Sequence, residues 1–307
     1  MACLTCLGDV MNFTGVLAFP LTPMNADGTL DEGCFRAGLD RLLSSGVNSI
    51  AIMGSTGLAA YLPMETRLAA IRCASGHLGN DIEWLVGVSA LTTRDALSLS
   101  RAAQEAGADA IFAAPMSYTP LTEREVVGYY AALSQVGLDL CIYNNPSTTK
   151  FAFSHPLIAE LSHLPNVRAI KMPLPSEGMG FGVELAGLRA TCLDGFAVGY
   201  SGDWGCAEGL RAGADAWFTA VGGVLPEAIL ALSHAAVSGD ANAFAHVQDQ
   251  CAKLMDLCKT HGSLRVLAAI TDRGAHPVTL PAPLDIPRPR GFEQALDAAM
   301  ADIAPLL

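Results

Sequence analysis

Lysine is scarce in this chain, and one lysine stands where carbonyl chemistry is expected. Lys150, Lys253 and Lys259 have polar neighbours, whereas Lys171 follows the apolar run 167–170 and has no acidic residue within several positions. A lysine removed from water favours its neutral amine, because burial disfavours the charged form. Such an amine attacks a carbonyl, and the iminium that forms withdraws electrons, so that a neighbouring C–C bond can be made or broken. The alternative is a structural lysine whose stem is buried and whose ammonium reaches water.

Two further segments carry groups that this chemistry needs. Tyr143 ends an apolar run that begins at position 138, and a phenol there can carry the protons that imine formation requires; a packing tyrosine is the alternative. Residues 54–57, Gly-Ser-Thr-Gly, offer backbone N–H groups and two hydroxyls to a carboxylate, although such tight turns are common. We therefore take Lys171, Tyr143 and Ser55 as candidate catalytic residues.

Short apolar runs recur at regular intervals along the chain and indicate which elements position these residues. Each run is rich in Val, Ile, Ala and Phe, is bounded by Gly, Asn or Pro, and is followed by a helical pattern. The runs predict parallel strands at 15–20, 49–54, 84–89, 110–115, 138–144, 167–172, 195–199 and 216–221. Their spacing of roughly 25 to 35 residues is that of a strand-loop-helix-loop unit.

Amphipathic segments predict the helices that cover such strands. They lie at 31–44, 63–76, 93–106 and 123–136, and further ones at 226–238, 241–261, 264–271 and 291–303. Eight strand-helix units favour an α/β fold, a closed (β/α)₈ TIM barrel, over an open doubly wound sheet. We expect a leader at 1–12, the barrel at 13–238, and a C-terminal helical subdomain at 239–307.

A barrel of this kind places its active site at the carboxyl-terminal ends of the strands. The polar residues at those ends are therefore candidates for one shared mouth. The expected substrate-binding residues are Gly54, Ser55, Thr56, Ser117, Tyr118, Gly199, Ser201 and Phe218.

Composition excludes several classes of function. A formal net charge of −12 argues against a nucleic-acid partner, because phosphate binding relies on clustered cations. Apolar runs are too short for a membrane span, the N-terminus lacks the order of a signal peptide, and nine scattered cysteines suit reduced thiols, which favours the cytoplasm. The seven histidines show no metal-site spacing, and Cys3 with Cys6 is expected to be an inert pair in the leader.

Taken in order, the segments resemble the dihydrodipicolinate synthase and N-acetylneuraminate lyase family of pyruvate-dependent class I aldolases. The resemblance runs from about Phe13 to Glu227 and is carried by 15–16 with 20–23, 54–57, 115–120, 143–146, 170–171 and 199–203. It implies Schiff-base formation on Lys171, acid/base action of Tyr143, and carboxylate binding with proton relay by Ser55 and Thr56. It also implies a 2-oxo acid substrate, a homotetramer built as a dimer of dimers, and no metal or organic cofactor.

The chain departs from the family pattern in ways that bear on the second substrate. The synthase branch has an arginine at the place of Thr148, which weakens a lysine-biosynthesis reading. A two-tyrosine pair is replaced by Ser117-Tyr118, so either side chain would have to complete a relay across subunits. Leu58 stands where many relatives carry Glu, a feature of 2-keto-3-deoxy sugar acid aldolases. A sugar-acid-like or semialdehyde partner therefore stays open.

Three other readings remain. A dehydratase of 2-keto-3-deoxy sugar acids would use the same imine. A barrel that had lost its proton relay would be a binding protein without catalytic activity. The glycines at 199–202 and 222–223 would suit a barrel that binds phosphate and catalyses a different reaction. The glycine-bearing segment 178–182 is expected to be a loop over the pocket.

Overall fold

A closed barrel of eight parallel strands forms the centre of the molecule in the computed structural model, which describes residues 10–286 and 288–307. The strands pair in chain order, and β1 closes the ring against β8 with Gly15 opposite Ala216. The strands are β1 (Gly15–Ala18), β2 (Ser49–Ile52), β3 (Glu83–Gly87), β4 (Ala110–Ala113), β5 (Asp139–Tyr143), β6 (Val167–Pro173), β7 (Ala197–Ser201) and β8 (Ala216–Thr219). The predicted (β/α)₈ barrel is thus confirmed.

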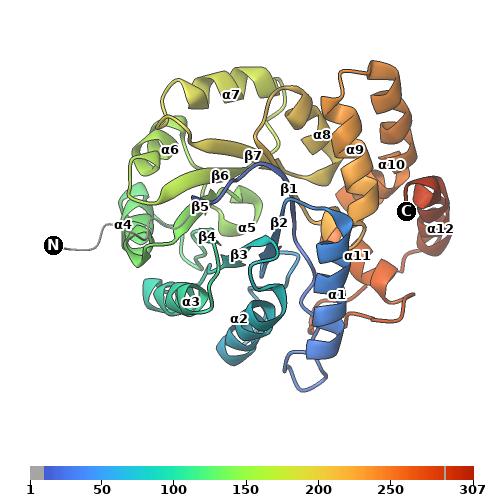
Figure 1. Ribbon diagram of the computed structural model, residues 1–307, viewed down its shortest axis with the longest axis horizontal. Coiled ribbons are helices and arrows are strands. Elements are labelled where there is room, and N and C mark those ends of the chain that lie inside the picture. Colours follow the sequence, from blue (N-terminus) through green and yellow to red (C-terminus); the bar gives the residue numbers. More distant parts are fainter. Residues whose placement is uncertain (1–9, 287) are drawn as a thin grey trace.

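Helices surround the barrel and continue beyond it as a group of C-terminal helices (Figure 1). Those of the barrel are α1 (Glu32–Ser45), α2 (Met64–Leu78), α3 (Thr93–Glu105), α4 (Glu123–Leu133), α5 (Pro146–Thr149), α6 (His155–Ser162), α7 (Phe181–Arg189), α8 (Asp203–Arg211) and α9 (Pro226–Val237). The later ones are α10 (Ala241–His261), α11 (Ser263–Thr271) and α12 (Phe292–Ile303). Helix α10 packs against α8, α9, α11 and α12, so these helices form one body with the side of the barrel.

Local sequence explains where several helices begin. The Asp31 side chain accepts from the Cys34 N–H at the start of α1, and Asp240 accepts from the N–H groups of Asn242 and Ala243 at the start of α10. Thr122 and Glu125 form a reciprocal capping box at α4. These caps satisfy N–H groups that the first helical turn leaves unpaired.

Two apolar layers hold the barrel together. Side chains that point into the barrel form an inner cluster, and those that point outward pack against the helices. The inner cluster is Met11, Phe13, Leu17, Phe19, Ala51, Leu85, Ala110, Phe112, Ala114, Cys141, Tyr143, Ala169, Ala216 and Phe218. Because strand side chains alternate between faces, this inner set fixes which residues of each strand reach the mouth.

The glycine-bearing segment at 178–182 differs from the expected loop. Phe181 and Gly182 belong to the first turn of α7, and the Phe181 ring packs edge-on against Tyr200, with ring centroids 4.8 Å apart. None of the residues 178–182 lines the cavity at the barrel mouth. None of the described helices is long and apolar enough to cross a membrane.

Candidate active site

Lys171 lies inside the barrel near the carboxyl-terminal end of β6. Its side chain is 6% exposed, and the strand register places it opposite Tyr143 of β5 and Gly199 of β7. Within the described residues, no carboxylate forms an ion pair with its amine. Lys171 is therefore a buried amine without a countercharge in contact, as its place in the sequence predicts.

Aromatic rings surround this amine. Its Nζ lies 3.7 Å from the ring centroid of Phe19, 4.2 Å from that of Tyr143 and 5.7 Å from that of Phe218. Ring faces exclude water and attract a cation. An iminium formed on Nζ would therefore have a favourable surrounding at the point where its charge develops.

Two glycines leave room for these rings. A Cβ on Gly199 would lie 2.5 Å from Phe218 Cε2 and 2.6 Å from the Ala216 carbonyl oxygen. A Cβ on Gly54 would collide with the ring of Phe19. Both glycines thus act through the rings that they admit next to Lys171.

A chain of polar side chains leads away from Tyr143. Its hydroxyl lies 3.3 Å from Ser55 Oγ and accepts a hydrogen bond of 3.0 Å from Asn145 Nδ2. Asn145 Oδ1 in turn accepts from Ser147 Oγ at 2.8 Å. Ser55 reaches this position because the backbone turns at Met53, whose φ of 59° lies in the left-handed region that non-glycine residues rarely adopt.

A cavity of about 600 Å³ opens beside this polar chain at the mouth of the barrel. Its wall comes from the ends of β2 to β5 and from the start of α11. The lining residues are Met53, Gly54, Ser55, Thr56, Ala59, Ala60, Tyr61, Ser89, Leu91, Phe112, Ala114, Met116, Ser117, Tyr143, Asn145, Ser147, Thr148, Thr149, Gly262, Ser263 and Leu264. Hydroxyls are abundant in this lining, and none of these described residues carries a charged side chain.

The structure brings most of the sequence-predicted residues together. Gly54, Ser55, Thr56, Ser117 and Tyr143 line the cavity, and the amine of Lys171 lies over the Tyr143 ring. Phe218 is one of the three rings around the Lys171 amine, and Gly199 leaves room for that ring.

Two expected substrate-binding residues lie elsewhere. Tyr118 is 94% exposed and is not part of the cavity lining, because its loop turns the phenol outward. Ser201 is also outside the lining, since its hydroxyl donates to the Met172 carbonyl at 3.1 Å and ties β7 to β6.

Sequence reasoning gave no role to several residues that the structure brings to the site. Tyr61, Ser89, Asn145 and Ser263 all line the cavity. Asn145 lies inside the Tyr-Asn-Asn-Pro motif, which is the signal that was available in the sequence. Ser263 comes from the start of α11, after the barrel, and no sequence motif around it indicates that it lines the cavity.

A buried carboxylate holds the ends of β7 and β8 in place. Asp203 accepts from Trp217 Nε1 at 2.9 Å and from the N–H groups of Ala220 and Val221 at 3.2 and 3.1 Å. Burial raises the pKa of this carboxyl above its ordinary value, although these donors oppose the rise. Asp203 is therefore a structural support of the barrel mouth, and it does not line the cavity.

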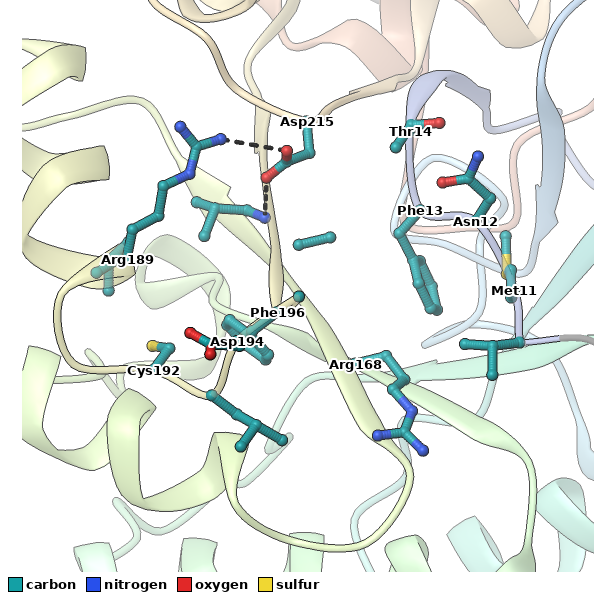
Figure 2. A pocket seen from close by; sticks show the side chains of 16 residues that line it. Met11, Asn12, Phe13, Thr14, Arg168, Arg189, Cys192, Asp194, Phe196 and Asp215 are labelled. Carbon is teal, nitrogen blue, oxygen red and sulfur yellow. Dashed lines mark hydrogen bonds and ion pairs between the residues drawn. The ribbon is translucent and has the colours of Figure 1, made fainter.

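A second cavity, of about 480 Å³, lies at the opposite end of the barrel (Figure 2). Arg189 pairs there with Asp215 at 3.2 Å, and Arg168 pairs with Asp139 at 3.3 Å. Because barrel enzymes react at the carboxyl-terminal face, paired charges at this amino-terminal end are assigned to stability.

A closed eight-stranded barrel with a buried lysine and a phenol at its mouth has the architecture of the Schiff-base-forming lyases. The dihydrodipicolinate synthetase family model matches residues 12–281, and the chain belongs to this family. The chain is accordingly a carbon–carbon lyase of the class I aldolase type, and the resemblance seen in the sequence is confirmed.

Individual relatives agree with this assignment. A dihydrodipicolinate synthase structure from Agrobacterium tumefaciens is 40% identical, has a TM-score of 0.91, and covers 95% of this chain and 98% of its own. The 4-hydroxy-tetrahydrodipicolinate synthase of Haloarcula marismortui is 32% identical over 232 residues, which are 75% of this chain and 74% of that protein. The enzyme of the same name from Neisseria meningitidis is 26% identical over 243 residues, or 79% and 82% of the two chains.

Proposed function

We propose that Lys171 forms a Schiff base with the C2 carbonyl of a 2-oxo acid. The observation that carries this proposal is the amine itself, 6% exposed among three aromatic rings and adjacent to the Tyr143 phenol. Nζ attacks C2, the carbinolamine loses its hydroxyl as water, and an iminium remains. The charge on nitrogen then accepts the electron pair of a neighbouring bond.

Tyr143 and Ser55 supply the proton transfers in this proposal. Tyr143 gives its proton to the carbinolamine hydroxyl, which leaves as water. In cleavage, the Tyr143 oxygen then takes up the proton of the substrate C4 hydroxyl, with Ser55 Oγ, 3.3 Å away, as the relay, while the C3–C4 bond breaks. The bonding pair moves toward the iminium and leaves an enamine, while the C4 fragment departs as an aldehyde. Protonation of the enamine at C3 and hydrolysis of the iminium by water then release pyruvate and restore the lysine.

The Gly54–Thr56 segment is proposed to receive the substrate carboxylate. The turn places the hydroxyls of Ser55 and Thr56 on the cavity wall, and Ser55 lies within 3.3 Å of the Tyr143 hydroxyl. A carboxylate held at this turn would direct the adjacent C2 carbonyl toward the barrel interior, where Nζ lies.

The second substrate is proposed to be an uncharged, hydroxyl-bearing aldehyde rather than a semialdehyde with its own carboxylate. Thr148 and Ser263 offer hydroxyls to the cavity, and the described lining has no cation to pair with a second anion. A carboxylate taken out of water without a partner is costly, whereas sugar-like hydroxyls exchange one set of hydrogen bonds for another.

We further propose a cytoplasmic homotetramer built as a dimer of dimers. Seven cysteines within the described residues are free thiols and five of them are buried, which is typical of a reducing compartment. One structure of this fold, 21% identical to this chain, is described as a monomeric dihydrodipicolinate synthase variant, so the oligomeric state of this chain has to be measured in solution.

Borohydride trapping with pyruvate tests the central step. We expect the wild-type chain to gain a reduced pyruvate adduct on Lys171, mapped by peptide mass spectrometry, and Lys171→Ala to gain none. The matched control is Lys150→Ala, since Lys150 is an exposed lysine outside the cavity lining. A wild-type chain that traps no pyruvate, or traps it equally in Lys171→Ala, would overturn the proposal.

A further inference from the structure

The hydroxyl of Tyr143 has a second partner that the chemistry above leaves without a role. Asn145 Nδ2 lies 3.0 Å from this hydroxyl and 3.5 Å from Ser55 Oγ, so one amide group faces both oxygens. The amide is oriented from its other side, because Ser147 Oγ donates to Asn145 Oδ1 at 2.8 Å. That bond leaves Nδ2, a donor, directed at the phenol oxygen.

The backbone also holds Asn145 in place. Its carbonyl accepts from the N–H groups of Thr148 and Thr149, at 3.1 and 3.0 Å, and from Thr149 Oγ1 at 2.9 Å. Pro146 follows directly and fixes its own φ. Asn145 therefore stands on a short, well-bonded helical turn, α5, immediately after β5.

A donor at this point determines where the phenol proton goes. The N–H group occupies one lone pair of the Tyr143 oxygen, so the phenol O–H is directed toward Ser55 or a substrate hydroxyl. When the phenol gives up its proton, the same N–H group stabilises the negative oxygen. The amide does not itself carry the proton, so its role would be to position Tyr143.

Other groups near the mouth are engaged elsewhere. Ser117 Oγ donates to the Thr119 carbonyl, and Tyr118 is 94% exposed. Within the described residues, Ser55 and Asn145 are the hydrogen-bond partners of the Tyr143 hydroxyl.

We propose that Asn145 is the positioning residue that orients Tyr143, so that the proton carrier of this site is completed within one chain. This inference rests on the proposed Schiff-base function. The sequence suggested that Ser117 or Tyr118 would complete the proton relay across two subunits. In this inference the side-chain amide of Asn145, in the same chain, orients Tyr143 instead.

Deuterium exchange into pyruvate tests the inference without the unknown second substrate. On the enzyme, the pyruvate iminium loses a C3 proton to give the enamine, which regains a deuteron from D₂O, and loss of the methyl signal is followed by NMR. We expect Asn145→Leu to slow exchange roughly three- to tenfold, the loss of one hydrogen bond. The matched control is Asn242→Leu, an exposed asparagine on α10 outside the cavity lining, which should exchange at the wild-type rate.

A pH profile separates positioning from a merely structural role. Asn145→Asp replaces the donor by a carboxylate, which opposes negative charge on the phenol oxygen and should move the rising limb of the exchange rate to higher pH. The titratable groups that face Tyr143 from its neighbours are Lys171 of β6, beside its ring, and Tyr130 of α4, near its backbone. Neither is altered by the substitution.

The possible results have distinct meanings. Wild-type rates and an unshifted profile in Asn145→Leu and Asn145→Asp would overturn the inference, while pyruvate trapping on Lys171 would leave the proposed function standing. A loss in Tyr118→Phe equal to that in Asn145→Leu would also overturn it, because a neighbouring chain would then supply the partner. A wild-type chain that neither traps nor exchanges pyruvate would instead refute the proposed function.

Discussion

Replacing Gly199 by alanine tests whether packing of the aromatic surround controls the Lys171 amine. The added Cβ would lie 2.5 Å from Phe218 Cε2 and 2.7 Å from Ala216 Cβ. Carbon atoms at rest are about 3.5 Å apart or more, so the ring or the strand has to move by roughly 1 Å. Overpacking of this kind costs about 1–3 kcal/mol. For a chain of this size, that lowers Tm by roughly 2–12 °C, since each kcal/mol shifts Tm by about 2–4 °C.

The same displacement should reach the chemistry. Phe218 lies 5.7 Å from Lys171 Nζ, and misplacing a reacting group by about 1 Å can slow a reaction roughly 100-fold. Because the ring is a neighbour of the reacting amine, we expect a tenfold or greater loss in pyruvate deuterium exchange.

Thermal unfolding and exchange are to be measured on Gly199→Ala beside a matched control. Gly76→Ala adds a methyl group to an exposed position of α2, where nothing lies within 4 Å, and should leave exchange unchanged and stability equal or higher. A Gly199→Ala chain that melts and exchanges as the wild type does would refute the reasoning, since the neighbours would then have room for the methyl group.

Two further predictions concern Thr148 in the cavity lining and the thiol of Cys34. Thr148→Arg should raise turnover of carboxylate-bearing aldehydes relative to uncharged ones by roughly 10- to 100-fold, the contribution of one charged hydrogen bond. The ratio of turnover with aspartate semialdehyde to turnover with glyceraldehyde, each in the presence of pyruvate, measures this change. An unchanged ratio would contradict the prediction. Burial and Asp31 raise the pKa of the Cys34 thiol to about 11, so its thiolate fraction keeps growing with pH until that value. Alkylation of Cys34 by iodoacetamide should accordingly speed up about tenfold per pH unit between pH 8 and 10, as peptide mass spectrometry would show; a plateau near pH 8.5 would contradict the raised pKa.

The barrel was predictable because its signals are local. Strands buried on both faces are continuous apolar runs, and the eight runs in the sequence coincide with β1–β8 apart from shifts of one or a few residues at their ends. The lysine was predictable for the same reason, since Lys171 ends such a run. The ends shift because residues such as Pro20 and Pro115 belong to the apolar run but lie beyond the last strand hydrogen bond.

The details of the site depend on side-chain direction and on distant parts of the chain. Tyr118 lies outside the cavity lining of its own chain because the course of its loop, and not its place after β4, determines where its phenol points. The Asn145 hydrogen bond depends on an amide rotamer that Ser147 fixes. Ser263 and Ser55 line the same cavity although about two hundred positions separate them in the sequence, and no local sequence pattern predicts that they do.

The start of α11 closes the cavity with Gly262, Ser263 and Leu264, whereas the amine and the phenol stand on β6 and β5. Under the proposed function, the residues that break the bond and the residues that contact the aldehyde would thus lie in segments far apart in the sequence. Substitutions at 262–264 would then change which aldehyde the cavity accepts while Lys171 and Tyr143 stay in place. Related enzymes with this arrangement would then differ in substrate through changes near the C-terminus alone.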